Sequence, residues 1–151
     1  MQLTVRRANV ADAAVVQEFN RLLALESEGK ALDLTLLGSG VAAILADPHK
    51  GLYFLAECEG QPVGQISVTY EWSDWRNGWF WWIQSVYVKP EFRRRGVFRA
   101  LYAHVERTAR QDPTVIGIRL YVERDNHVAH KTYQGMGLDW TSYRVMEKYP
   151  L

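Results

Sequence analysis

Residues 85–101 are the stretch of this sequence best suited, by residue type and order, to binding phosphate. The stretch opens with alternating β-forming residues, and Pro90 ends that run because proline has no N–H to donate to a neighbouring strand. A helical pattern of apolar residues begins at Val97, directly after Gly96. The first turn of a helix carries N–H groups without helical partners and the positive end of the helix dipole, and glycine allows a ligand to approach it. With three arginines just before it, this turn predicts an anion site shaped for phosphate.

A second stretch, residues 126–138, places an asparagine and a tyrosine on one side of a helix. Ala129 and Tyr133 follow Asn126 by three and seven positions, which is the spacing of residues on one helix face. Two glycines near the end of the stretch predict where the helix stops. Considered alone, this pattern is typical of a plain amphipathic helix with a buried tyrosine.

Together, the two stretches resemble the acyl-CoA-binding motifs of the GNAT superfamily of N-acyltransferases. The strand that Pro90 ends, followed by Arg93 and Gly96, is similar to the family's pyrophosphate loop. The sequence departs from that loop at Phe98, where the family usually has glycine or alanine. The second stretch is similar to the family pattern Asn-x-x-Ala-x-x-x-Tyr-x-x-x-Gly. Both motifs occur in the family's order with a predicted strand between them, and the similarity is strongest over residues 83–138.

The resemblance implies a fold and a co-substrate. The fold is mixed α/β (α+β), with a mostly antiparallel central sheet flanked by helices. One pair of parallel strands, here ending near Val88 and Val122, splays apart in the family. Acetyl-CoA would be the co-substrate, with its pantetheine arm paired to the first of these strands, and no metal is implied. The implied cofactor-binding residues are Val86, Val88, Arg93, Arg94, Arg95, Gly96, Phe98, Arg99 and Asn126.

The resemblance also implies an activity, the transfer of an acetyl group from acetyl-CoA to an amine by direct attack in a ternary complex. An alkyl ammonium group has a pKa of about 10, so the acceptor must lose a proton before it attacks the thioester. A backbone N–H between Val86 and Val88 could donate to the oxyanion. Tyr133 matches the family tyrosine that protonates the departing thiolate.

The sequence offers more than one candidate for the general base. Many relatives use a glutamate on the strand before the loop, but the nearest position here is Gln84, which cannot act as a base. Glu71 is therefore the tentative base, and Asp74 on the same hairpin is an alternative. Either could act through water, or the amine could arrive partly neutral. His127 and His130 lie on the predicted helix surface, where a structural role is expected.

The rest of the pattern predicts the element order β-α-α-β-β-β-α-β-α-β. Asn9, with Asp12, is expected to cap the first helix, and Ser39 is expected to cap the second. Successive hairpins predict antiparallel neighbours, and the crossover through the helix after Gly96 predicts a parallel pair. The expected strands are residues 3–7, 51–58, 63–72, 116–122 and 138–147. A further strand is expected to follow the hairpin turn at Asn77-Gly78 and to continue to Val88.

Five of the six tryptophans lie within residues 71–82. Asn77-Gly78 within this stretch is typical of a type I′ turn, so the stretch predicts a hairpin. Strand alternation cannot bury all five indoles on one face. Cross-strand packing or a homodimer interface is the preferred interpretation, and a wall of the acceptor pocket is the alternative.

Length and composition predict one domain over residues 1–151. The formal net charge of +1 provides no general attraction to nucleic acid or to an anionic membrane. Cys58 is the single cysteine, which excludes an internal disulfide and fits a reducing compartment. No stretch resembles a signal peptide or a membrane span, and the expected location is the cytoplasm.

Two other classes of function remain open. One is an acyl-CoA-binding regulatory domain without turnover, against which the hydroxyl of Tyr133 argues. The other is a nucleic-acid-binding module that uses the arginines and the stacked tryptophans, against which the low net charge argues. The sequence leaves the acceptor open between a small-molecule amine and a peptide amine.

Overall fold

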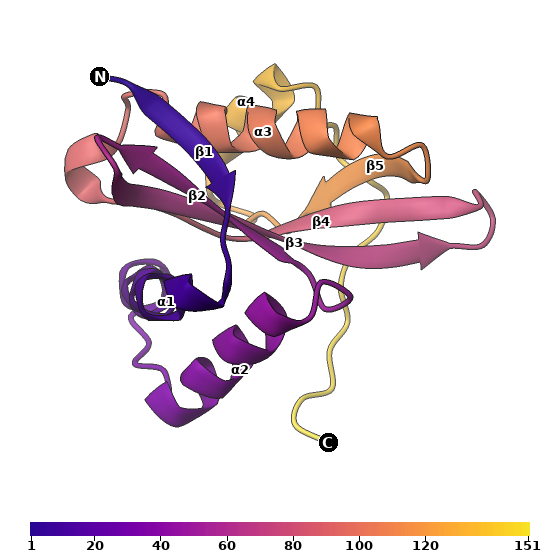
Figure 1. The fold of residues 1–151 in the computed structure, drawn as a ribbon. Coiled ribbons are helices and arrows are strands. Elements are labelled where there is room, and N and C mark those ends of the chain that lie inside the picture. The colour runs from indigo at the N-terminus through magenta and orange to yellow at the C-terminus, as the bar shows by residue number, and fades with distance from the viewer. The chain divides into compact units, whose positions relative to one another are not determined.

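The computed structural model describes all residues, 1–151, in two units, Met1–Leu120 and Tyr121–Leu151 (Figure 1). The second unit contains one helix, α4 (His127–Gly135). The single domain expected from the sequence stays a prediction. The first unit contains β1 (Leu3–Arg7), η1 (Val10–Asp12), α1 (Ala13–Glu28), α2 (Leu34–Ala46), β2 (Leu52–Cys58), β3 (Gln61–Ser73), β4 (Gly78–Val88), η2 (Pro90–Phe92), α3 (Val97–Gln111) and β5 (Val115–Leu120).

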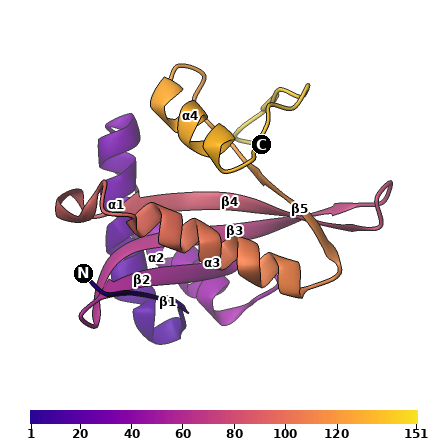
Figure 2. The same ribbon diagram turned by 90° about the horizontal axis from the view of Figure 1, so that it is seen from above.

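The five strands form one sheet in the order β1-β2-β3-β4-β5 (Figure 2). The first four strands are antiparallel to their neighbours, whereas β4 and β5 are parallel because α3 carries the chain across the sheet between them. Helix α3 covers one face of this sheet, and α1 and α2 cover the other (Figure 1). The expected mixed fold with one parallel pair is therefore confirmed.

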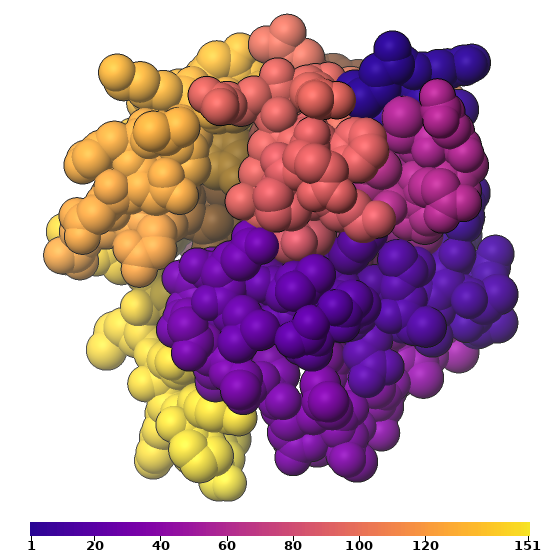
Figure 3. Space-filling model, turned by 90° about the vertical axis from the view of Figure 1, so that its left-hand side faces the viewer, coloured from indigo at the N-terminus to yellow at the C-terminus, as the bar shows by residue number.

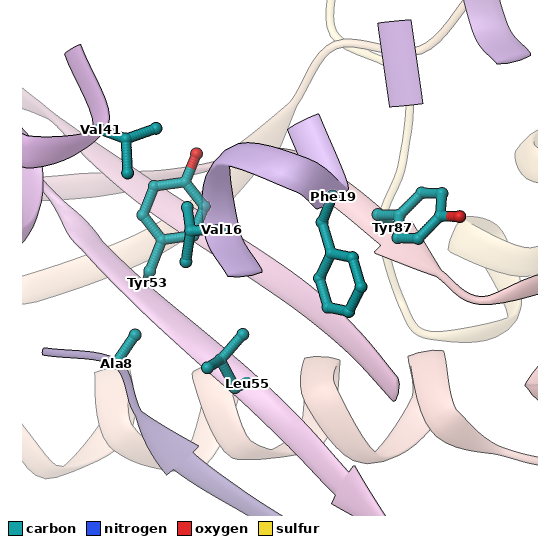
Figure 4. Packing of buried hydrophobic residues seen from close by; sticks show 7 residues of the cluster. All are labelled: Ala8, Val16, Phe19, Val41, Tyr53, Leu55 and Tyr87. Atoms are coloured by element: carbon teal, nitrogen blue, oxygen red, sulfur yellow. The ribbon is translucent and has the colours of Figure 1, made fainter. Parts of the chain in front are cut away.

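The packing between α1, α2 and the sheet buries seven residues from five segments of the chain (Figure 4). The ring centroids of Phe19 on α1 and Tyr87 on β4 are 5.1 Å apart, so the first helix packs against the C-terminal end of β4. Burial of an aromatic or aliphatic side chain contributes roughly 1.5–3 kcal/mol, so this cluster fixes the end of β4 firmly. Its members are Ala8, Val16, Phe19, Val41, Tyr53, Leu55 and Tyr87.

The cap expected at Asn9 is present on η1, the 3-10 segment that leads directly into α1, whereas the cap expected at Ser39 is wrong. The side chain of Asn9 accepts from the Ala11 N–H, and Asp12 accepts from the Asn9 N–H, so both halves of the expected capping box are present. The cap of α2 is Asp33 and not Ser39, because the Asp33 carboxylate accepts from the N–H groups of the first turn. Ser39 lies inside that helix.

The expected type I′ turn at Asn77-Gly78 is also wrong. Ser73 pairs with Gly78, so four residues, 74–77, connect β3 and β4. Asn77 has φ +49°, but Gly78 is already in the strand and does not have a positive φ. A Cβ at Gly78 would lie 2.4 Å from Cγ2 of Ile116, so this glycine allows β5 to approach closely.

The strand expected over residues 138–147 does not form, and β5 is the last strand of the chain. A strand exists only where a neighbouring strand satisfies its N–H and C=O groups, and alternation alone does not supply such a neighbour. The side chains that suggested it are exposed: Trp140, Tyr143, Val145 and Met146. No helix of the chain combines the length and the apolar composition that crossing a bilayer requires.

Candidate functional site

Strand β4 is longer than the ladder that pairs it with β5, so the C-terminal part of β4 has no β5 neighbour. The parallel ladder runs from Trp79↔Val115 to Ile83↔Leu120 and stops there, whereas β4 continues to Val88. The backbone edge of β4 beyond Ile83 therefore has no β5 partner. This arrangement agrees with the expected divergence of the two parallel strands, although β5 ends at Leu120 and not at Val122.

Backbone geometry shows which groups lie on that open edge. The N–H of Lys89 donates to the Val63 carbonyl of β3 at 2.9 Å. Because successive residues of a strand direct their backbone groups to opposite edges, the N–H and C=O of Val88 point away from β3. Its carbonyl accepts from Nε of Arg93 at 2.9 Å, which agrees with this direction.

A β-bulge interrupts β4 just before that point. Gln65 pairs with Tyr87 and Ser67 pairs with Gln84, so β4 contains one extra residue between these two pairs. Ser85 takes the extra position in a left-handed conformation, with φ +49°. Val86, the expected partner of pantetheine, directly follows the bulge.

The predicted anion site is a loop and a helix start in the first unit. Gly96 is the N-cap of α3 with φ +83°, and no side chain caps the first turn. The first-turn N–H groups have no acceptor within the helix, which makes this end attractive to anions. A Cβ at Gly96 would meet no atom within 4 Å, so the glycine faces open space. A cavity of about 310 Å³ lies here, lined by Val88, Phe92, Arg93, Arg94, Gly96, Val97, Phe98 and Arg99.

The arginines of the loop have two different roles. Arg93 is fixed, because its guanidinium binds the carboxylate of Glu26 on α1 as well as the Val88 carbonyl. Figure 3 shows the loop on the surface beside the α1–α2 segment that contains Glu26. Arg94, Arg95 and Arg99 are exposed and form no ion pair, so their charge is available to a ligand. We therefore expect Arg93 to hold the loop in place and the other three to provide positive charge.

Phe98, the departure from the family pattern, is half-buried in the first turn of α3. Its ring lies 6.3 Å from the ring of Tyr102, one turn further along the same helix. The ring therefore packs along α3 while the residue also lines the cavity. This placement explains how a large side chain fits where the family usually has a small one.

Phe98→Ala should change the dissociation constant for CoA less than about threefold. The backbone N–H of this position would face the phosphate, and alanine leaves that group in place. The ring packing on Tyr102 is lost, so we expect destabilisation of about 1–2 kcal/mol. Calorimetric titration and thermal melting measure the two effects. An affinity for CoA that rises tenfold or more would show that the ring obstructs the site.

The second unit contains the other motif. Asn126 is the N-cap of α4, and its side chain accepts from the Ala129 N–H at 3.1 Å. The helix ends at Gly135, and Gly137 adopts φ +90°, as the two glycines predicted. Tyr133 is half-buried, and burial raises the pKa of its hydroxyl above the ordinary value. The phenol therefore stays protonated at neutral pH, which is the state that a proton donor requires.

The tentative base Glu71 belongs to a polar cluster on β3, β4 and β5. Its Oε1 accepts from Nη1 of Arg119 at 2.8 Å and from Nε1 of Trp82 at 3.1 Å. The Arg119 guanidinium also lies 3.7 Å from the centroid of the Phe80 ring. Oε2 makes no hydrogen bond within this cluster, so Glu71 is held by one oxygen and presents the other.

The other polar residues considered from the sequence have partners close to them in the chain or on the adjacent strand. Gln84, which stands where relatives have a glutamate, donates to Oγ1 of Thr69 at 3.0 Å. Asp74, the alternative base, accepts from the Trp75 N–H in the hairpin loop. His130 contacts the Glu123 carbonyl through Nε2 at 2.8 Å, in agreement with a structural role.

The tryptophans are divided between packing and polar contacts. Trp72 and Trp79 are directly opposite across β3 and β4, with ring centroids 5.0 Å apart, as expected for cross-strand packing. Trp82 points its indole N–H at Glu71. Trp75, in the loop, is 88% exposed.

Sequence reasoning missed Arg119. The available signal was a charged residue within the otherwise apolar run 115–120, because a charge in such a strand usually has a partner across the sheet. The partner itself depends on register: Trp82 is opposite Arg119, and Thr69, two residues before Glu71, is opposite Trp82.

The chain is similar to known acetyltransferases in sequence and in structure. A model of the acetyltransferase (GNAT) family matches residues 16–138. The crystal structure of a possible acetyltransferase from Clostridium difficile 630 has a TM-score of 0.93 at 41% identity, over 100% of this chain and 99% of that chain. No curated protein matches the sequence.

More distant structures share the fold alone. A predicted acetyltransferase with acetyl-CoA from Clostridium acetobutylicum has a TM-score of 0.80 at 16% identity, over 97% of this chain and 96% of that chain. Glucosamine-6-phosphate N-acetyltransferase from Arabidopsis thaliana has a TM-score of 0.74 at 17% identity, over 99% of this chain and 100% of that chain.

Proposed function

This chain belongs to the acetyltransferase (GNAT) family, and we propose that it transfers the acetyl group of acetyl-CoA to an amine acceptor within a ternary complex. The observation that carries the proposal is the uncapped start of α3 at Gly96, with a cavity and three unpaired arginines around it. A pyrophosphate bears charge that such a helix start and such arginines would stabilise. The acceptor would be a small-molecule amine or a peptide amine, and the cytoplasmic location stays a prediction.

The proposed transfer assigns a role to each candidate residue. Backbone groups of Val86 and Val88 would hold the pantetheine arm at the open edge of β4, while the loop residues Arg94 to Arg99 would bind the pyrophosphate. The amine nitrogen would form a bond to the thioester carbon, and the Val86 N–H would donate to the resulting oxyanion. The C–S bond would then break, with the Tyr133 hydroxyl giving its proton to the departing sulfur.

Glu71 is the proposed route for the proton of the acceptor amine. Arg119 and Trp82 fix Oε1 and leave Oε2 to take a proton through a water molecule. Asn126, proposed from the sequence as a cofactor-binding residue, would act mainly by capping α4 and so by holding the helix that carries Tyr133. No step of the proposal requires a metal.

A thiol-release assay tests the function. Acetyl-CoA would be offered with a library of amines, and free thiol would be measured with a colorimetric reagent, alongside a calorimetric titration of CoA. Amine-dependent release of thiol is the expected result. CoA binding without release for any amine would favour the regulatory domain, and no CoA binding at millimolar ligand would contradict both.

Glu71→Gln should lower kcat/KM for the acceptor about 100-fold at pH 7, because a general base that acts through water contributes at the lower end of the usual range of about 10²–10⁴-fold. The loss should shrink as pH rises toward the ordinary amine pKa of about 10, since more acceptor is then neutral before it binds. Glu57→Gln is the matched control, because Glu57 is also an ion-paired glutamate on a strand, bound to Arg6 at 2.8 Å. A loss that is equal at all pH values would assign Glu71 to acceptor binding and not to proton removal.

A further inference from the structure

The bulge in β4 holds a serine in a conformation that serine normally avoids. Ser85 has φ +49°, and a non-glycine residue there persists only where its surroundings hold it. The next peptide group contains the C=O of Ser85 and the N–H of Val86. In a trans peptide these two groups lie in one plane and point in opposite directions, so whatever holds the carbonyl also aims the N–H.

The group that holds the carbonyl is the side chain of Gln65. This glutamine is fully buried on β3, and its Nε2 donates to the Ser85 carbonyl at 3.2 Å and to Oδ1 of Asn20 at 3.3 Å. An ordinary strand residue would present a backbone N–H to its neighbour, but the extra residue of the bulge disrupts that ladder. The amide of Gln65 therefore supplies the donor that the ladder lacks.

The orientation of this amide is fixed by its neighbours. Nδ2 of Asn20 donates to the Val16 carbonyl at 3.1 Å and to the Tyr53 hydroxyl at 3.0 Å, so Oδ1 of Asn20 must face Gln65. The end of Gln65 that meets two acceptors must then be its NH₂ group. Tyr53 and its hydroxyl appear in the packed cluster of Figure 4.

The carbonyl oxygen of the Gln65 side-chain amide accepts no hydrogen bond. Oε1 of Gln65 is buried and has no hydrogen-bond partner. A buried polar atom without a partner is destabilising, and its presence in a native core calls for an explanation. An apolar residue would avoid this penalty but could not hold the Ser85 carbonyl.

We propose that Gln65 is a positioning residue for acetyl transfer: by holding the Ser85 carbonyl it directs the Val86 N–H away from the core, as an oxyanion donor. This inference rests on the proposed function of the site. Asn20 on α1 supports Gln65 by accepting from its Nε2, and the Val16 carbonyl keeps Asn20 oriented, whereas the Tyr53 hydroxyl contacts Asn20 alone.

The test compares Gln65→Met with Tyr53→Phe. Methionine has nearly the shape of glutamine and no donor, so kcat should fall at least tenfold, while KM for acetyl-CoA changes less than about threefold. Tyr53→Phe removes one hydroxyl from the same network without touching Ser85, and kcat should stay within about twofold of the wild type. Assays at a temperature well below every melting transition separate these effects from unfolding. An unchanged kcat in folded Gln65→Met, or equal losses in both variants, would overturn the proposal.

Ser85→Gly gives an independent test, because glycine adopts the bulge conformation without help. Adding Ser85→Gly to Gln65→Met should restore part of the lost kcat, whereas independent effects of the two substitutions would contradict the inference. If the wild type released no thiol with any amine, the proposed function would fail on its own. Hydrogen exchange of residues 84–88 would then decide: faster exchange in Gln65→Met than in Tyr53→Phe supports the positioning role, and equal rates refute it.

Discussion

Tyr133→Phe should lower kcat by about 10²–10⁴-fold, the usual contribution of a general acid, and should leave KM for acetyl-CoA nearly unchanged. The substitution keeps the ring and removes the proton that would go to the departing thiolate. Because burial raises the pKa of this hydroxyl, the proton is present throughout the neutral range. The wild-type rate should therefore not decline from loss of the acid until the pH exceeds the ordinary tyrosine value of about 10.

Single-turnover measurements give the clearest result, since product release often limits steady-state rates and would hide part of the loss. The loss should also shrink with a thioester whose leaving thiol is more acidic, because that thiolate needs less help from a donor. Tyr143→Phe is the matched control, since Tyr143 lies in the same unit and is 69% exposed. Full activity of Tyr133→Phe in a single turnover would assign the proton to water or to another group.

Features that depend on neighbouring residues in the chain could be predicted from the sequence. The capping box at Asn9 and Asp12, the helix start at Gly96 and the end of α4 at Gly135 each depend on a few consecutive residues. Their side chains and backbone preferences act on groups one turn away. The loop arginines directly precede Gly96 in the chain, so their place beside the start of α3 could also be predicted from the sequence.

Features that depend on register could not be predicted in the same way. Gly78 has the form of a turn glycine in the sequence, yet its role is to admit Ile116 from a strand 38 residues later. Arg119 and Glu71 are 48 positions apart and meet only because β4 lies between their strands. No local pattern indicates such a pair.

The segment 138–147 illustrates the opposite error. Apolar and polar residues alternate in two short stretches, 138–140 and 143–145, but such a period describes only how side chains would face once a neighbouring strand exists. Gln65 is a related case, since one polar side chain in an apolar run gave no indication of a bulge on the adjacent strand. Whether residues 138–147 form a strand, and where β4 has its bulge, both depend on the pairing with a neighbouring strand and not on the period of the side chains.

Gly96→Val should raise the dissociation constant for CoA about 100-fold. A branched side chain is strained at φ +83°, and relief of that strain would turn the first N–H groups of α3 away from the pyrophosphate. Each charge-assisted hydrogen bond contributes roughly 1.5–3 kcal/mol, so losing one or two of them gives an effect of this size. Gly96→Ala, with one methyl group, should have a smaller effect of about tenfold.

Gly29→Val provides the matched control for backbone strain. Gly29 ends α1 with φ +61°, and a Cβ there would also meet no atom within 4 Å. Both valine variants should therefore lose a similar stability, about 1–2 kcal/mol, which thermal melting measures. Only the Gly96 variants should lose affinity in calorimetric titrations, because a helix end with its carbonyls exposed does not attract phosphate. Wild-type affinity in folded Gly96→Val would place the pyrophosphate site elsewhere, and an equal loss in Gly29→Val would attribute the effect to stability alone.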